Sequence, residues 1–340
     1  MNKFKFYLIL SIITTSIISC SKKDAPVVEP PRDYATQYAT DNTDIEEYLK
    51  TNFITVINHP GFSDDQDVTI SPIANGEISI WDQTTYQLKT RDVSIHNIIY
   101  KTYYLVLRKG IGQSPCNVDG VLASYRGDYL ERITATGATT STVTATKFQE
   151  VKFPQSILSL YSAITGWGEI FPQFKTGTSS SNADGTITHN DFGAGVMFFP
   201  SGLAYYAYGK DNIPAYAPLV FSFKLFEIQR LDLDYKIANG LAVLDPDGIP
   251  SNLEDLDGDG YMYDYRNTVN YPTAPADAIR YADDTDKDGI PDFLDVDDDG
   301  DNYTTKLEIK NPATGLPYPF ANIPICTSGK KNYLDLTCHP

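Results

Sequence analysis

The sequence is poor in the residues that build metal–thiolate, zinc or nucleophilic sites. It has only four cysteines and four histidines in 340 residues, and the histidines stand alone, without ligand partners at suitable spacing. It contains no glycine-rich phosphate loop, no serine elbow and no carboxylate pair suited to acid–base catalysis. Chemistry that depends on those motifs is therefore not indicated. After residue 20, no apolar run is long enough to cross a bilayer as a helix.

Positive charge is also scarce. The chain has 27 Lys and Arg against 44 Asp and Glu, a net charge of −17. This balance argues against a nucleic-acid partner and against attraction to anionic lipid. The excess of negative charge is concentrated in residues 245–308, where 19 acidic and four basic residues give a net charge of −15. The remainder is close to neutral and rich in Tyr, Phe, Val and Ile, which is typical of a β-rich globular domain.

The first twenty residues predict export and lipidation. Lys3 and Lys5 form a basic start, and residues 6–18 form an apolar stretch too short to span a membrane. The stretch ends in Ile-Ile-Ser-Cys20, which resembles the lipobox of bacterial lipoproteins. The resemblance implies a signal peptide over residues 1–19 and a lipid on Cys20, which anchors the protein to a membrane. The alternative is an ordinary secretory signal with a chance cysteine.

Residues 20–42 are predicted to be a flexible tether, and residues 43–92 an N-terminal extension. Because no acidic run follows Cys20, we expect an outer-membrane location facing the periplasm rather than surface display. Thr43 and Glu46 have the spacing of a capping box, which predicts a helix from Thr43 to about Asn52.

The other cysteines predict one disulfide. Cys326 and Cys338 lie near the C-terminus at a spacing unlike that of a zinc pair. An extracytoplasmic compartment permits a disulfide between them. Cys116 would then be a free or buried thiol, although its pairing with one of the tail cysteines is an open alternative.

The middle of the chain predicts an α+β domain built on an antiparallel sheet. One short helix is expected near Trp167, limited by Pro172. Residues 134–147 and 177–195 are polar and are expected to form exposed insertions. The strand candidates, each rich in β-branched or aromatic residues, are residues 103–107, 118–125, 196–199 and 219–228.

Residues 93–231 resemble the FKBP family of peptidyl-prolyl isomerases. The matching strings, in the order of the family, are Tyr104 to Gly110, Asp119 to Gly127, Ile164 to Glu169, Phe199 to Tyr205, and Ile213-Pro214 followed by Ala217 to Phe221. The resemblance implies an antiparallel sheet wrapped on a short helix, and proline-containing polypeptides as partners. Rotation about an X-Pro bond changes no covalent bond, so an apolar aromatic pocket suffices and no cofactor is needed for catalysis.

The resemblance also implies the site residues. Trp167 would form the floor of the pocket, and Ile164 a wall with a backbone N–H for the substrate. Tyr205 would donate a hydrogen bond to a substrate carbonyl, although Tyr208 can be aligned to the same role. The remaining implied members are Tyr125, Phe153 and Phe221 as aromatic sides and Ile213 at the rim. For each of them, packing in the core is the alternative.

One departure from the family pattern bears on activity. Where the family carries Phe-Asp, the nearest equivalent here is Phe148-Gln149, displaced by an insertion. Glutamine accepts a hydrogen bond but carries no charge. Two hypotheses therefore stand: a folding helper with isomerase activity in the cell envelope, or a non-catalytic FKBP-like module.

The acidic segment, residues 245–308, predicts structural Ca²⁺ sites in a separate, loop-rich region, followed by a tail over residues 309–340. Alternating carboxylates, a turn glycine and a closing carboxylate are what a calcium loop requires. The first loop consists of Asp284, Asp286, Asp288, Asp292 and Asp295; the second of Asp297, Asp299, Asp301, Tyr303 (by its carbonyl) and Glu308. Upstream, Asp255, Asp257 and Asp259 begin a third loop that is either incomplete or completed by Asp264. The run resembles thrombospondin type 3 and EF-hand-like repeats. The alternative is a disordered acidic linker.

Overall fold

The computed structural model describes residues 29–338. The predicted signal segment and the lipidation site at Cys20 lie outside these residues, so both stay predictions. Of the described residues, 33–338 form one compact unit. Within residues 29–338, no helix combines the length and the apolar character that crossing a membrane requires.

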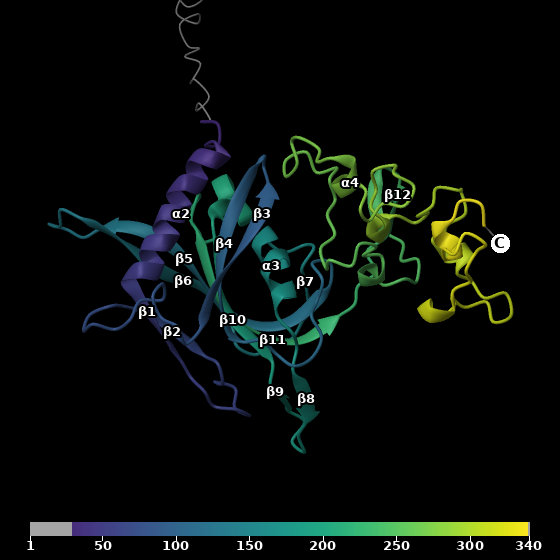
Figure 1. The fold of residues 1–340 in the computed structure, drawn as a ribbon. Helices are drawn as coiled ribbons and strands as arrows, with labels where there is room; N and C mark the ends of the chain where they lie inside the picture. The colour runs from purple at the N-terminus through teal and green to yellow at the C-terminus, as the bar shows by residue number, and fades with distance from the viewer. Residues whose placement is uncertain (1–28, 339–340) are drawn as a thin grey trace, which may run out of the picture. The chain divides into compact units, whose positions relative to one another are not determined.

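The described chain is mainly antiparallel β-structure with few helices (Figure 1), which confirms the α+β expectation in its coarse form. The helices are α2 (Tyr34–Thr51), α3 (Thr165–Ile170), α4 (Asp277–Arg280) and α5 (Thr305–Glu308). The strands are β1 (Asn52–Val56), β2 (Val68–Pro72), β3 (Gln87–Ile95), β4 (Ile98–Arg108), β5 (Gly120–Thr134), β6 (Ser141–Val151), β7 (Leu158–Ser159), β8 (Thr178–Ser181), β9 (Ile187–Asn190), β10 (Gly193–Phe199), β11 (Leu219–Gln229), β12 (Tyr235–Ala238) and β13 (Leu241–Leu244).

A seven-stranded antiparallel sheet organises the fold. Its order is β3-β4-β10-β11-β5-β6, and β7 pairs with β5 outside this path. Side chains alternate between the two faces, as the period of a strand requires. In β10, Met197 and Phe199 belong to the apolar cluster on the face covered by α3, whereas Val196 and Phe198 belong to the cluster on the face covered by α2. Figure 1 shows the two helices on opposite sides of the sheet.

Helix α2 begins ten residues earlier than the capping box with Thr43 as N-cap predicted. Its N-cap is Asp33, whose carboxylate accepts a hydrogen bond from the Thr36 amide at 2.9 Å. The Thr43 hydroxyl instead donates to the Ala39 carbonyl inside the helix. Residues 34–42 are therefore helical, and the prediction that the tether extends to residue 42 is wrong.

The N-terminal extension is part of the sheet's packing. Ile45 and Leu49 of α2 are fully buried against Tyr103 and Leu105 of β4. Strand β3 begins at Gln87 and so spans the boundary that the sequence predicted at residue 93. The extension covers one face of the sheet and leaves the other face to α3.

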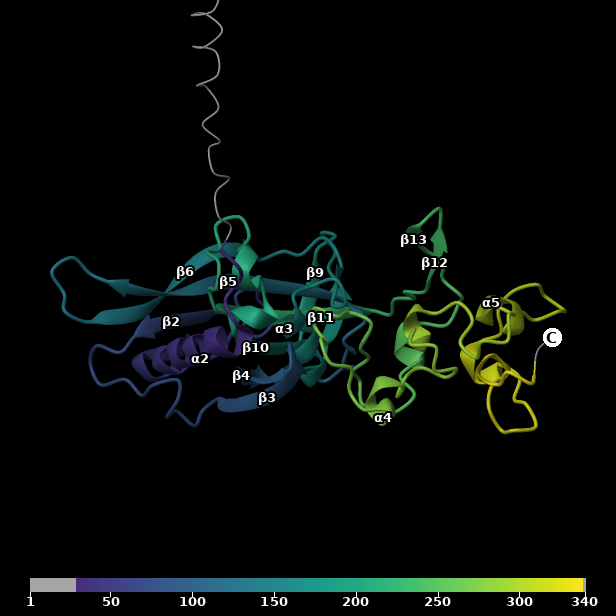
Figure 2. The ribbon, with the colours of Figure 1, turned by 90° about the horizontal axis from the view of Figure 1, so that it is seen from above.

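The two polar insertions are hairpins. One is the end of the β5–β6 pair, and the other is formed by β8 and β9. Helix α3 ends at Ile170, and Pro172 lies in the 3₁₀ turn that follows, Phe171–Gln173, so the limit set by this proline is confirmed. Beyond β11 the chain is mostly irregular, with the short β12–β13 hairpin and helices α4 and α5 (Figure 2).

Candidate functional site

A hollow of about 530 Å³ opens beside α3 on the sheet face that this helix covers. Its volume lies in the range of small-ligand pockets. Trp167, the third residue of α3, lines it and is only 5% exposed. The fifteen lining residues are Tyr125, Phe148, Gln149, Ile157, Leu158, Ser159, Ser162, Ala163, Ile164, Thr165, Trp167, Ala204, Tyr205, Lys210 and Phe221.

Aromatic rings set edge to face form the wall and floor of the hollow. Tyr125 of β5 lies edge-on to Trp167, with ring centroids 5.0 Å apart, and Phe221 of β11 lies 5.2 Å from the same indole. Phe148 of β6 packs edge-on to Phe221 at 5.7 Å. This close approach requires glycine at position 127, because a Cβ there would lie 2.5 Å from the Phe148 ring. The result is an apolar hollow whose rings fix one another's orientation.

Polar groups stand at the edge of the hollow. Tyr205 lines it, and burial raises the pKa of its hydroxyl, which therefore remains a donor at neutral pH. Tyr208 is 90% exposed and does not line the hollow, so the geometry favours Tyr205 for the hydrogen-bonding role. Ile164 immediately precedes α3, and no hydrogen bond of the described residues uses its N–H as donor.

Two residues predicted for the site lie elsewhere. Phe153 is 69% exposed and lines no part of the hollow; its position after the end of β6 turns it toward solvent. Ile213 is buried in the same apolar cluster as Trp167 and Phe221 and does not line the hollow. The structure places Phe148 where the sequence suggested Phe153. It also adds Ile157 and Lys210, which carry no motif that could have revealed them.

The departure from the family pattern is retained in the geometry. Gln149 lines the hollow next to Phe148, so this part of the wall carries a neutral amide. Neither polar insertion supplies a lining residue. The β8–β9 hairpin instead packs on the far part of β11, where His189 stacks on Phe226 at 4.2 Å. The hollow therefore remains open.

The three acidic loops share one backbone conformation. In each loop the amide of the sixth residue donates to the first carboxylate: Gly260 to Asp255, Gly289 to Asp284, and Asn302 to Asp297, at 2.9, 3.0 and 3.0 Å. The fourth and sixth residues all have positive φ, which glycine and asparagine tolerate best. The regular spacing in the sequence thus corresponds to a repeated fold.

The carboxylates converge in each loop. The groups Asp255–Asp257–Asp259, Asp284–Asp286–Asp288 and Asp297–Asp299–Asp301 each bring three oxygens within 4.8 Å of one another. In the second loop Glu308 is 3% exposed, and neither of its oxygens has a hydrogen-bond partner among the described residues. Burial and the charges of Asp299, Asp301 and Asp297 raise the pKa of Glu308 to about 9. An orphaned carboxylate beside three others fits a hard cation such as Ca²⁺.

In the first loop, Asp292 and Asp295 lie outside the Asp284–Asp286–Asp288 group. Asp292 accepts hydrogen bonds from the amide and hydroxyl of Thr285, a residue of the same loop, at 2.8 and 2.7 Å. Burial, together with the charges of Asp288 and Asp286, raises the pKa of Asp295 to about 6.

The upstream loop is not completed by Asp264. This carboxylate pairs with the Arg266 guanidinium at 2.8 Å and also accepts the Arg266 amide. Asp283, from the following segment, instead accepts the Leu256 amide inside the loop at 2.8 Å. The alternative in which this site is incomplete fits the geometry better.

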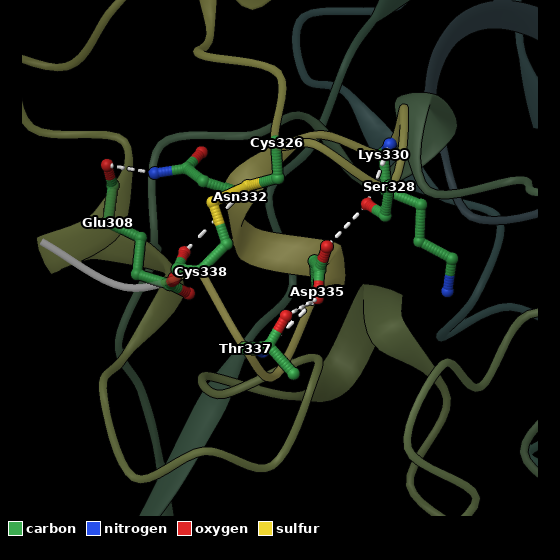
Figure 3. Close-up of a disulfide and its surroundings, with 8 residues drawn as sticks. All are labelled: Glu308, Cys326, Ser328, Lys330, Asn332, Asp335, Thr337 and Cys338. Atoms are coloured by element: carbon green, nitrogen blue, oxygen red, sulfur yellow. Dashed lines mark hydrogen bonds between the residues drawn. A yellow bond between two sulfur atoms is a disulfide. The ribbon is translucent and has the colours of Figure 1, made fainter.

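A disulfide fastens the C-terminal tail, as predicted. Cys326 and Cys338 are bonded (Figure 3). Cys116 is a free, buried thiol. Within the bridged turn, Asn332 donates a hydrogen bond to the Glu308 carbonyl at 2.6 Å. The tail therefore contacts the end of the second acidic loop.

Comparison with known proteins finds similarity in two regions. Residues 244–333 match the family model described as BamM C-terminal, which covers less than half of the chain. No curated protein matches the chain.

Among solved structures, the chain is similar to a peptidyl-prolyl cis-trans isomerase from Pseudomonas syringae pv. tomato, with 22% identity and a TM-score of 0.27, covering 38% of this chain and 75% of that one. It is also similar to FkpA from Escherichia coli, with 23% identity and a TM-score of 0.27, covering 38% of this chain and 48% of that one. A third similar structure is the N-terminal domain of FKBP42 from Arabidopsis thaliana, with 14% identity and a TM-score of 0.27, covering 38% of this chain and 86% of that one. The chain therefore spans about half of FkpA.

Proposed function

We propose that this chain is a peptidyl-prolyl cis–trans isomerase of the FKBP type that assists protein folding in the bacterial cell envelope. The observation that carries the proposal is the open hollow of about 530 Å³ with Trp167 on its floor and Tyr125, Phe148 and Phe221 on its walls. It rests on this chain's own geometry and on the sequence strings of residues 93–231.

The proposed mechanism needs no nucleophile. The barrier to rotation about an X-Pro bond, about 18–20 kcal/mol, comes from amide resonance, and the enzyme must favour the twisted amide that has lost it. The apolar rings would hold the proline side chain. The Tyr205 hydroxyl and the Ile164 N–H would donate hydrogen bonds to substrate carbonyls beside the twisting bond, and Gln149 would add a neutral polar contact.

A protease-coupled isomerisation assay tests this proposal. A chain that begins at Glu29 should speed the cis–trans exchange of a proline-containing peptide above the rate in buffer. A rate equal to that in buffer, from protein with an intact circular dichroism spectrum, would refute catalysis. In that event the second candidate, a non-catalytic module that binds proline-containing chain, is favoured, because this chain has the uncharged Gln149 where the family pattern has a carboxylate.

We also propose that the acidic segment binds structural Ca²⁺ in the loops 284–295 and 297–308. The orphaned Glu308 and the convergent carboxylates support this assignment. Because ligation energy orders a segment of like charges, millimolar Ca²⁺ should increase protease resistance and change the circular dichroism spectrum. If both are the same in Ca²⁺ and in chelator, the assignment fails.

We further propose that a lipid on Cys20 anchors the protein to the outer membrane, facing the periplasm. The lipobox-like sequence and the match to the BamM C-terminal family support this location. Metabolic labelling with a fatty acid should mark the native chain and not the variant Cys20→Ser. Equal labelling of both would exclude this anchor.

A further inference from the structure

A fourth group of carboxylates meets inside the C-terminal segment, outside the spacing of the three acidic loops. Asp247, Glu254 and Asp298 each bring an oxygen within 4.8 Å of the others. Asp247 follows β13, Glu254 follows the 3₁₀ turn Ser251–Leu253, and Asp298 lies within the second acidic loop. All three are 1% exposed. The group therefore joins three separate stretches of chain in the interior.

These carboxylates have almost no partners. Neither oxygen of Glu254 or Asp298 has a hydrogen-bond partner among the described residues, and the same is true of one oxygen of Asp247. The second Asp247 oxygen accepts the Ile249 amide at 2.6 Å. Among the ion pairs of residues 29–338, none includes a member of this group.

Buried acids of the sheet region, residues 33–231, have partners. Asp41 accepts hydrogen bonds from the Ser201 amide and hydroxyl at 2.7 and 2.6 Å. Glu169 pairs with Arg91 at 2.8 Å and accepts from the Tyr263 hydroxyl at 3.0 Å. A buried charge is costly unless a partner compensates it. The Asp247–Glu254–Asp298 group lacks such partners, as Asp234 and Glu308 do, and its three converging carboxylates call for a positive charge.

We propose that Asp247, Glu254 and Asp298 hold one Ca²⁺ ion. Carboxylate oxygens suit a hard cation, and a group without cysteine or histidine disfavours zinc. Ca²⁺ accepts six to eight oxygens in flexible geometry, whereas Mg²⁺ keeps several waters, which a site this buried does not favour. Asp232 and Asp234 form a further group with Asp247 and add negative charge beside it.

This ion would act as a crosslink. It would fasten the base of the β12–β13 hairpin and the following 3₁₀ turn to the second acidic loop. The site differs from the two proposed loop sites, because none of the three carboxylates belongs to the ligand positions of those loops. It does not rest on the proposed isomerase activity.

Calcium counting tests the proposal. A chain that begins at Glu29 is stripped with chelator, dialysed against Ca²⁺, and analysed for tightly bound Ca²⁺ per chain. The double variant Glu254→Gln, Asp298→Asn keeps side-chain shape and should bind one ion fewer. The control Glu131→Gln, Asp277→Asn removes the same charge from two exposed positions and should keep the full count. A double variant that folds and also keeps the full count would overturn the proposal.

The melting temperature gives a second readout, because the double variant should differ from the parent in one way in chelator and in another way in Ca²⁺. In chelator the Glu254→Gln, Asp298→Asn variant should melt at a higher temperature than the parent, because repulsion is relieved. In Ca²⁺ its melting temperature should rise less than that of the parent. A variant that gains as much from Ca²⁺ as the parent would contradict the site.

If the double variant does not fold, an experiment on the unaltered chain tests the proposed site. Crystals soaked in Tb³⁺, a calcium substitute with strong anomalous scattering, should show a peak about 2.3–2.6 Å from oxygens of Glu254 and Asp298. No peak there at saturating ion would overturn the proposal. Peaks at the loops 284–295 and 297–308 are scored separately, so a failure of those sites is distinguishable from a failure of this one.

Discussion

The shape of the hollow beside α3 predicts different effects for the removal of two phenylalanines that are close together in the sequence, Phe148 and Phe153. Phe148→Ala should lower kcat/KM in the isomerisation assay, and Phe153→Ala should not. A proline ring that covers about 50 Å² of the Phe148 ring gains about 1.2 kcal/mol at 25 cal/mol per Å². Loss of that contact in the transition state corresponds to about an eightfold fall in kcat/KM. Phe153 is 69% exposed and lines no part of the hollow, so its removal should change kcat/KM by less than about twofold.

The assay must distinguish a lost contact from a lost fold. Phe148 is half-buried against Phe221, so its truncation should cost less than the roughly 3–5 kcal/mol typical of a fully buried phenylalanine. Both variants should therefore give the parent circular dichroism spectrum at the assay temperature. If Phe153→Ala loses activity while Phe148→Ala keeps it, the assignment of the hollow as the proline site is refuted.

Three further outcomes are expected. Tyr205→Phe should lower kcat/KM about two- to twelvefold, the effect of losing a hydrogen bond of about 0.5–1.5 kcal/mol, whereas Tyr208→Phe should leave it unchanged; equal losses would contradict the assignment. Without reductant, a chain beginning at Glu29 should be inert to a thiol reagent when folded, because burial shields Cys116 and raises its pKa. Unfolding should release one reactive thiol per chain, and three would disprove the pairing of Cys326 with Cys338. Chelation of Ca²⁺ should speed amide hydrogen exchange in α3 but not in α2, and an equal change in both helices would exclude a specific link.

Much of the sheet could be predicted because its strands alternate. Leu219, Phe221, Phe223 and Leu225 of β11 all belong to the cluster under α3, as their period of two required, whereas Val220 faces α2. The pocket's floor and one wall followed from short strings around Trp167. These features are local in the sequence, so the sequence alone could indicate them.

The identity of the third aromatic wall depended on a β-bulge. In the β5–β6 ladder Gly127 pairs with Gln149 and Asp128 pairs with Lys147, so Phe148 has no opposite residue. The extra residue bends the strand and turns its side chain toward the hollow. No pattern of apolar residues marks such a shift in register, and Phe153 was therefore an equally reasonable prediction from the sequence.

The start of α2 was missed for a different reason. The first turns of this helix bury polar side chains: Asp41 binds Ser201, and Gln37 donates to Asp41 at 2.6 Å. A pattern of apolar residues does not indicate such contacts, because the partner, Ser201, lies far along the chain. The same limit applies to the Asp247–Glu254–Asp298 group: Asp298 lies more than 40 residues from the other two and meets them only in the folded chain.

The acidic segment contacts α3, the helix beside the hollow, and these contacts would link the proposed calcium sites to the proposed proline site. Tyr261, which follows the upstream acidic loop, donates a hydrogen bond to the Glu169 carbonyl at 3.0 Å, and Tyr263 donates to the Glu169 carboxylate at 3.0 Å. Glu169 is 2% exposed and lies two residues after Trp167 in the same short helix. A helix of six residues has little stability of its own, so these contacts and the Arg91 ion pair help to fix the position of the indole. We therefore expect ordering of the acidic segment to reduce the mobility of Trp167 at the floor of the hollow, although no proposed calcium ligand contacts the substrate.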